Sequence, residues 1–179
     1  MLMDGFNGLL GRRRSCRRFA GGEIGADDVR LILEAALLSP TSRSRRAWHF
    51  TVVDDALLLA QLADAKDTGA QFLKGAAVAV VVAADATADD CWIEDCSIAA
   101  WSMQLQAEAL GLGSCWAQIR GRGLSDGTAA ADVVRGVLGL PPELGVLCVV
   151  GFGRKAGDDD GTPRGGDGLK WENVHINGF

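Results

Sequence analysis

The pattern of apolar and polar positions along this chain has two kinds of segment, one typical of helices and one typical of strands. Apolar side chains recur every three to four positions in residues 27–37, behind an Asp-Asp pair whose negative charge favours a helix N-terminus, and Pro40 closes the pattern. Residues 48–53 are aromatic and β-branched, and residues 76–84 are apolar throughout. Both segments predict strands, and the second predicts a strand that is covered on both faces.

The remaining pattern adds four helices and two strands. Helices are predicted over residues 2–10, 54–65 (capped by Asp54 and Asp55), 90–110 and 129–138, and strands over residues 114–119 and 144–151. Because helices alternate with buried strands, we expect one sheet with helices on both faces. Neither G-x-G-x-x-G nor G-x-x-x-x-G-K-[ST] follows a predicted strand, so the usual dinucleotide-binding and P-loop folds are excluded.

Two apolar stripes run along the predicted helix of residues 90–110. One stripe consists of Cys96, Ala100, Met103, Ala107 and Leu110, and the other of Ile98, Trp101, Leu105 and Ala109. A helix that is apolar nearly all round is buried nearly all round. In a chain of this size we therefore expect one side of it to pack on the sheet and another on a second subunit.

The C-terminal part of the chain departs from this pattern. Residues 154–168 are polar and glycine-rich, and residues 169–176 become apolar again. Terminal segments are ordered when they dock on something, so we expect residues 154–179 to lie on the partner subunit. We find no internal repeat and no linker, which predicts one domain over residues 1–179.

Composition narrows the class of protein. The chain has 179 residues, 48% of them hydrophobic, so it can bury a core without disulfides or a metal. A net charge of −5 argues against nucleic acid or a membrane surface as a partner. The five cysteines form no C-x-x-C pair, which fits a reducing compartment. With no signal-peptide pattern and no apolar run of membrane-spanning length, we expect a cytoplasmic protein.

Eight of the eighteen cationic side chains of this acidic chain gather in two short windows that also hold hydroxyl groups. The first window has Arg12, Arg13, Arg14, Arg17 and Arg18 with Ser15, and the second has Arg43, Arg45 and Arg46 with Thr41, Ser42 and Ser44. Guanidinium and hydroxyl donors together suit a phosphate. From composition alone, a solvated basic face or ion pairs with the many carboxylates explains these windows equally well, whereas a nucleic-acid patch is disfavoured.

Four segments, in order, resemble the FMN-dependent nitroreductases. They are R-R-S-C-R-R-F at residues 13–19, S-P-T-S-R-S-R-R-A-W-H-F at 39–50, W-I-E-D-C-S-I-A-A at 92–100 with A-L-G-L-G-S-C-W at 109–116, and L-G-L-P at 138–141 with V-V-G-F-G-R-K at 149–155. Each motif is weak by itself, but the four together span most of the chain in the family's order.

This resemblance implies an α+β fold in which a mixed, mostly antiparallel sheet lies between two helical layers (α/β/α), an intertwined homodimer, and FMN at the subunit interface. By position, one protomer supplies Arg13, Arg14 and Ser15 to the phosphate and ribityl chain of FMN, with Arg154 and Lys155 near the phosphate. The same protomer supplies Arg17 to the pyrimidine edge of the flavin. The residues expected along the flavin ring are Cys115, Trp116, Ala117 and Gln118. The other protomer supplies Thr41, Ser42, Ser44 and Arg46. Positive charge at Arg17 favours the anionic reduced flavin.

The implied reaction is a ping-pong transfer. NADH or NADPH reduces the flavin at N5 and leaves, and the flavin then reduces an electron-poor acceptor such as a nitroaromatic or a quinone, without an obligatory side-chain acid or base. Two alternatives stay open: a protein that binds or sequesters FMN without turnover, and a specialised relative that dehalogenates or consumes its flavin. The chain lacks the helical insertion that walls the substrate pocket of larger members, so their substrates do not transfer.

Other reactive side chains are explained by structure rather than chemistry. Cys91 and Cys96 stand near a helix start, where a thiol pKa can fall, but burial is the simpler explanation. His49 and His175 are isolated, so we expect no metal site. Trp116 is the aromatic residue that falls beside the expected flavin.

Overall fold

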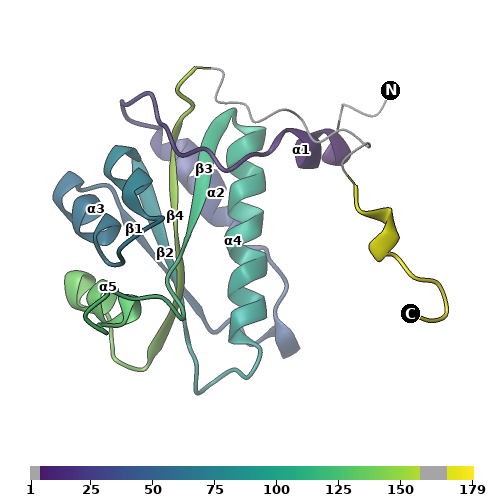
Figure 1. Ribbon diagram of the computed structural model, residues 1–179. Helices are drawn as coiled ribbons and strands as arrows, with labels where there is room; N and C mark the ends of the chain where they lie inside the picture. The colour runs from purple at the N-terminus through teal and green to yellow at the C-terminus, as the bar shows by residue number, and fades with distance from the viewer. Residues whose placement is uncertain (1–4, 158–168) are drawn as a thin grey trace.

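A four-stranded antiparallel sheet forms the centre of the molecule, with strand order β1-β2-β4-β3 (Figure 1). The computed structural model describes residues 5–157 and 169–179. The strands are β1 (Trp48–Val53), β2 (Val78–Asp85), β3 (Leu112–Gln118) and β4 (Leu144–Arg154), and the helices are α1 (Phe6–Arg12), α2 (Ala26–Leu37), α3 (Ala56–Ala63), α4 (Trp92–Ala109) and α5 (Ala130–Leu138). Short 3-10 turns are η1 (Ser42–Ser44), η2 (Gln71–Gly75) and η4 (Trp171–Asn173).

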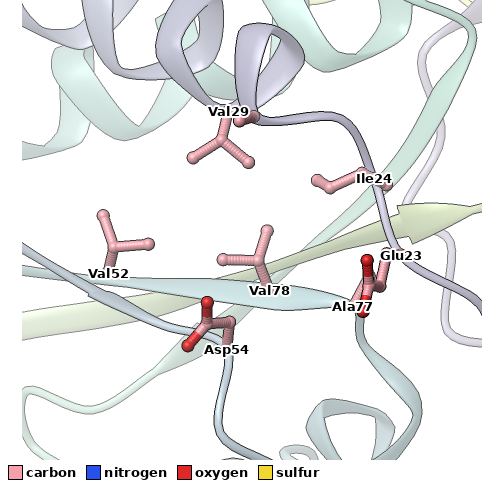
Figure 2. A pocket seen from close by; sticks show the side chains of 8 residues that line it. Glu23, Ile24, Val29, Val52, Asp54, Ala77 and Val78 are labelled. Carbon is pink, nitrogen blue, oxygen red and sulfur yellow. The ribbon is translucent and has the colours of Figure 1, made fainter.

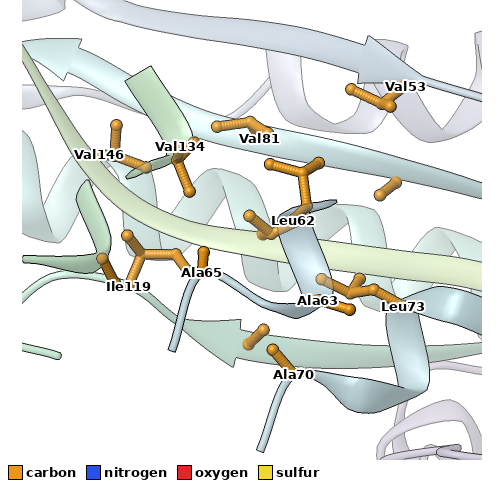
Figure 3. Packing of buried hydrophobic residues seen from close by; sticks show 14 of the residues in the cluster. Val53, Leu62, Ala63, Ala65, Ala70, Leu73, Val81, Ile119, Val134 and Val146 are labelled. Carbon is orange, nitrogen blue, oxygen red and sulfur yellow. The ribbon is translucent and has the colours of Figure 1, made fainter. Parts of the chain in front are cut away.

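Helices cover both faces of the sheet, as the apolar pattern of β2 predicts. Ala79, Val81 and Ala83 point into one buried cluster, which α3, η2 and α5 close (Figure 3). The alternate residues, among them Val80 and Val82, point into a second cluster formed with α2 and α4. The expected three-layer α/β/α arrangement is therefore confirmed. The ladders are antiparallel, and the parallel pairing among the described residues is one bridge, Ser15 to Ser114.

Local sequence signals set several element ends. Asp55 caps α3, because its Oδ1 accepts hydrogen bonds from the amides of Leu57 and Leu58 at 2.9 Å. Gly139 ends α5 in a left-handed conformation with φ 63°, which costs glycine little. Helix α2 ends at Leu37, ahead of Pro40.

The observed bounds depart from the expected ones by a few residues. Strand β1 has the predicted limits, whereas β4 continues three residues past residue 151, to Arg154. Helix α3 ends at Ala63 instead of about residue 65. Helix α1 starts at Phe6, and residues 2–4 of the predicted opening helix lie outside the described residues. The extension of β4 matters most, because it brings Arg154 into the sheet.

Helix α4 buries one of its two predicted stripes inside the protomer. Cys96, Ala100, Met103 and Ala107 are fully buried against the sheet. The second stripe is only partly covered, and Ile98 and Trp101 remain 40% and 39% exposed.

The C-terminal segment lies away from the body of the protomer (Figure 1). Trp171 is 68% exposed, and the other large apolar side chains of residues 169–179 are exposed as well. The predicted polar stretch falls largely on residues 158–168, outside the described residues. In the described parts of the chain, no helix combines the length and apolar character needed to span a membrane.

Candidate functional site

The N-terminal segment of residues 13–19 docks on the sheet beside β3 and the end of β4. The Cys16 amide donates to the carbonyl of Ser114 at 2.9 Å, next to the bridge between Ser15 and Ser114. The Ala20 amide donates to the carbonyl of Arg154, also at 2.9 Å. The family resemblance assigns residues 13–17, 115–118 and 154–155 to one site. Within one protomer, the first segment thus lies beside the start of the second and beside the third.

Two glycines permit this close approach. A Cβ at Gly113 would stand 2.7 Å from Cys16 Sγ and 2.8 Å from Cys16 Cβ. A Cβ at Gly153 would stand 2.9 Å from Cδ1 of the Phe19 ring. Since real Cβ atoms do not approach other atoms so closely, any larger residue at either position must push the segment away from the sheet.

The cations of this region differ in how they are held. The Arg13 guanidinium lies over the ring of Trp101 on α4, 5.0 Å from its centroid, and Arg14 Nη1 donates to the Arg13 carbonyl at 2.7 Å. Lys155 Nζ forms a 2.8 Å ion pair with the buried carboxylate of Glu108. Arg17 and Ser15 are exposed. Arg17 and Ser15 are therefore open to a ligand, whereas Lys155 is already engaged.

The outer edge of β3 offers main-chain groups to this region. In an antiparallel edge strand, alternate residues turn their amide and carbonyl away from the sheet. Ser114 faces outward, since its carbonyl accepts from Cys16, and so do Trp116 and Gln118. The Gln118 carbonyl accepts a 2.8 Å hydrogen bond from Lys66 Nζ. The outward main-chain groups of Trp116 lie between these two occupied positions.

Side chains of β3 complete the edge. The indole Nε1 of Trp116 donates to Gln118 Oε1 at 2.9 Å, which fixes both side chains on the face towards α4. Cys115 and Ala117 point into the opposite cluster. Burial raises the pKa of the Cys115 thiol, and the Arg17 charge opposes this. The contribution of Cys115 to a ligand is therefore its main chain rather than a thiolate.

Lys66 is a site residue that sequence reasoning missed. It is 8% exposed, and burial, followed by the charge of Arg122, lowers its pKa. Its partner Gln118 lies 52 positions away. No local pattern marks Lys66, because it follows the predicted helix as an isolated lysine.

The second arginine window, residues 41–46, forms a turn at the other end of α4. Arg43, Ser44 and Arg46 have φ angles of 51°, 55° and 52°, a region that side chains other than glycine rarely enter. The Ser42 amide donates to both carboxylate oxygens of Asp95 at 3.0 Å. Within residues 5–157 and 169–179, no hydrogen bond or ion pair joins this turn to residues 13–17, so its assignment to the partner's cofactor stays a prediction.

The donor set around β3 fits a phosphorylated flat ring. Guanidinium groups and the Ser15 hydroxyl suit a phosphate, and an open strand edge suits the polar rim of a heterocycle. Fully apolar or carboxylate-rich surroundings would not fit FMN, and neither is found around Ser15 and Arg17. The residues expected to hold FMN are therefore compatible with it.

Two cavities lie elsewhere, along the free side of β1 and the adjoining face of α2. The first, of about 440 Å³, is lined by Glu23, Ile24, Val29, Val52 and Asp54 among others (Figure 2). The second, of about 520 Å³, is lined by side chains of the same two elements, His49 of β1 among them, together with Arg46. Both lie by β1, an edge strand that pairs with β2 alone among the described strands.

An acidic group at the start of α4 was also missed. Ligand atoms of Asp89, Asp90 and Cys91 lie within 4.8 Å of one another. Arg45 Nη1 stands 3.8 Å from Asp89 Oδ1 and 3.6 Å from Asp90 Oδ1, so a guanidinium already faces this group. The absence of a metal site remains a prediction. All five cysteines are free thiols, and burial raises the pKa of Cys96 to about 12, which supports its structural interpretation.

Comparison with known proteins identifies the family. The sequence matches the nitroreductase family over residues 10–69 and 59–154. A protein from Archaeoglobus fulgidus, whose name assigns it as an NADH dehydrogenase/NAD(P)H nitroreductase, is 34% identical over 156 residues, which are 85% of this chain and 86% of that protein. The structure of an FMN-dependent nitroreductase from Clostridium difficile R20291 is 40% identical with a TM-score of 0.94, covering 97% of this chain and 100% of the other.

A more distant structure extends the likeness of fold. A protein from Desulfovibrio desulfuricans, described as a nitroreductase in complex with FMN, is 23% identical with a TM-score of 0.76, covering 97% of this chain and 96% of the other. With its sequence matched over most of its length and its fold shared with these structures, the chain belongs to the nitroreductase family.

Proposed function

We propose that this protein is a homodimeric, FMN-dependent oxidoreductase that takes electrons from NADH or NADPH and passes them to an electron-poor small molecule. The names of the Clostridium difficile and Archaeoglobus fulgidus relatives support FMN and NAD(P)H respectively. The observation that carries the proposal is the docking of residues 13–19 on β3 and β4, because it gathers the cationic and hydroxyl groups of three distant segments.

The residues of one protomer divide between the two ends of the cofactor. Arg13, Arg14 and Ser15 are assigned to the phosphate. Arg154 and Lys155 are given a supporting role there, because Lys155 already forms an ion pair with Glu108 and would have to share its ammonium group. Arg17 is assigned to the pyrimidine edge, where its charge favours an anionic ring. The main chain of Cys115, Trp116, Ala117 and Gln118 is assigned to the rim of the ring, and Lys66 holds the end of this edge through the Gln118 carbonyl.

When bound, FMN supplies the two-electron chemistry that links the nucleotide to the acceptor. The chain's own residues bind and orient the cofactor and stabilise negative charge on it. No side chain is assigned as an obligatory acid or base. The physiological acceptor could be a nitroaromatic, a quinone or a similar molecule, in two alternating half-reactions at one place.

The surface of α4 supports a second subunit. Ile98 and Trp101 leave an apolar stripe partly uncovered, and Phe6 of α1 is 64% exposed near it. The partner is proposed to supply Thr41, Ser42, Ser44 and Arg46 to the cofactor of the first protomer. This arrangement explains why the two arginine windows are not joined within one chain.

The C-terminal tail supplies a further contact in this dimer. We assign the exposed apolar side chains of residues 169–179 to the two cavities along β1 and α2 of the partner. Both cavities combine apolar and polar side chains in their linings, and Lys170 complements Glu23 and Asp54 at the first of them. Residues 1–179 then form one domain whose tail, residues 154–179, docks on the other subunit.

Anaerobic reduction tests the function. The purified protein should be yellow, or become so with added FMN, and NADH or NADPH should bleach its visible absorbance, with the colour returning when a nitroaromatic or quinone is added. Colour without bleaching would instead indicate an FMN-binding protein without turnover, and loss of the flavin during reduction would indicate a flavin-consuming enzyme. A colourless protein that takes up no FMN would refute the proposal.

A further inference from the structure

A buried carboxylate of α4 anchors the strained turn of residues 41–46. The Ser42 amide donates to Oδ1 and Oδ2 of Asp95, each at 3.0 Å, and Asp95 is 5% exposed. The turn contains three non-glycine residues with positive φ, a conformation that opposes its formation. A turn of this kind persists only where its surroundings impose it, and the bond to Asp95 is such a constraint.

A second buried carboxylate, Asp89, lies against the first. Its side chain is 0% exposed, and its Oδ1 accepts from the Cys91 amide at 3.0 Å. Its Oδ2 is buried and finds no donor within residues 5–157 and 169–179 when both carboxyls are ionised. The Asp89 carboxyl is one of the groups that raise the pKa of Asp95, which makes the two carboxyls neighbours. Two adjacent buried carboxylates cannot both carry charge at low cost, and a proton between them provides the missing donor.

We propose that Asp95 is a neutral acid which donates its proton to Asp89 Oδ2, and that this acid pair positions residues 41–46 for the cofactor. One oxygen of Asp95 donates to Asp89 while the other accepts from the Ser42 amide, so each polar group has a partner. The cofactor part of this inference rests on the proposed function. The shared proton and the bond between Asp95 and the turn do not.

The charges around the pair agree with a retained proton. Burial raises the pKa of Asp95 and the Asp89 carboxyl adds to this, whereas the Ser42 amide acts in the opposite direction. The groups that face the pair are Arg45, Asp90, Cys91, Glu94 and Cys96. Arg45 is the cation at ion-pair distance among the described residues, and it is shared with Asp90.

The pH dependence follows from the direction of this shift. Because the folded state raises the pKa of Asp95, it holds the proton to a higher pH than the unfolded chain does. The contribution to stability is present in full at low pH and is lost as pH rises through the raised pKa. The free energy of unfolding should therefore fall as pH rises through the raised pKa, whereas the Ser42 amide, which favours the ionised carboxyl, keeps its bond to Asp95.

Three variants separate the proton from the side chain. Asp95→Asn keeps one oxygen for the Ser42 amide and offers an amide N–H to Asp89 without a titrating proton, so it should hold the turn at every pH. Asp95→Ala removes both bonds and should release it. Asp27→Asn makes the same chemical change at a carboxylate that is 95% exposed and serves as the control.

The measurements use the cofactor-free protein first. Infrared spectra should show the carbonyl stretch of a protonated carboxylic acid that disappears as pH rises. That band should be absent from Asp95→Asn and retained in Asp27→Asn. Over the same pH range, the free energy of unfolding should fall further in the wild type than in Asp95→Asn. The hydrogen-exchange protection of the Ser42 amide should be lost in Asp95→Ala and retained in Asp95→Asn. A wild type without the acid band, or a Ser42 amide that stays protected in Asp95→Ala, overturns the proposal.

FMN titration then tests the positioning role. Asp95→Ala should weaken FMN binding about tenfold or more, the scale of a hydrogen bond to a charged or acidic group, and Asp95→Asn should restore it. Full FMN affinity in Asp95→Ala overturns the positioning role, whereas absence of FMN binding in the wild type refutes the proposed function and leaves the infrared result standing. A transition that shifts with EDTA would assign the group to a cation and overturn the shared proton.

Discussion

Gly113→Ala is the substitution that most directly challenges the docking of the N-terminal segment. The new Cβ would lie 2.8 Å from Cys16 Cβ, an atom fixed to the backbone that no rotamer change can move. Relief requires the segment to retreat by at least about 0.6 Å, to the 3.4 Å of an ordinary contact. A shift of that size away from β3 stretches the 2.9 Å bond from the Cys16 amide to the Ser114 carbonyl beyond the usual range.

The expected effect on stability follows from the crowding. Overpacking of this kind destabilises a fold by about 1–3 kcal/mol. For a chain of this length each kcal/mol lowers Tm by about 2–4 °C, so Gly113→Ala should melt about 2–12 °C below the wild type. Because the displaced segment carries Arg13, Ser15 and Arg17, FMN affinity should fall as well.

Calorimetry and FMN titration, each against matched variants, check this reasoning. Gly136→Ala adds the same methyl group to α5, where nothing lies within 4 Å, and should raise the free energy of unfolding by about 0.5–1 kcal/mol. The double variant Cys16→Gly/Gly113→Ala lacks both crowding atoms, Sγ and Cβ of Cys16. It should therefore bind FMN as tightly as Cys16→Gly alone. A Gly113→Ala protein with the Tm and FMN affinity of the wild type would show that the segment does not dock on β3.

Three further variants, two substitutions and a deletion, probe the cofactor site, the dimer and the strained turn. Arg13→Ala should weaken FMN binding by about 1.5–3 kcal/mol in a fluorescence titration, and unchanged affinity would remove Arg13 from the phosphate site. Deletion of residues 169–179 should shift the protein towards monomer in light scattering and lower its FMN content, whereas an intact dimer would refute the docking of the tail. Arg43→Gly should raise the free energy of unfolding, measured by denaturant titration, by about 1 kcal/mol, because glycine relieves a φ of 51°. Ser125→Gly, in an exposed turn without positive φ, is the control and should lower the free energy of unfolding in the same assay.

The layers of the fold were predictable because they depend on the spacing of apolar residues along each helix and strand. Residues 76–84 are apolar at every position, and this pattern requires cover on both faces, which α3 with α5 and α2 with α4 provide. The end of β4 was not predictable in the same way. Residues 152–154 carry a glycine and an arginine that weaken any strand pattern, yet β4 continues there because it pairs with β3 as far as Leu112, and Gly153 leaves room for the Phe19 ring.

The site was predictable only where its residues belong to contiguous motifs. The family resemblance assigned residues 13–17, 115–118 and 154–155 to one site, and backbone hydrogen bonds bring these segments together. Lys66 and Asp95 contact residues that lie 52 and 53 positions away in the sequence. Neither has a signature of its own, because a lone lysine after a helix and an aspartate in a first helical turn both have ordinary explanations.

The strained turn shows most clearly why local rules fail at this site. Residues 43–46 read R-S-R-R, and nothing in that sequence favours the left-handed φ angles that Arg43, Ser44 and Arg46 adopt. The conformation is imposed from outside, by the bond of the Ser42 amide to Asp95 and by Arg45 reaching the acidic start of α4. A turn that depends on a distant carboxylate loses its support when that carboxylate is removed. Its geometry is therefore a property of the contact with the start of α4, which no pattern of hydrophobic and polar positions encodes.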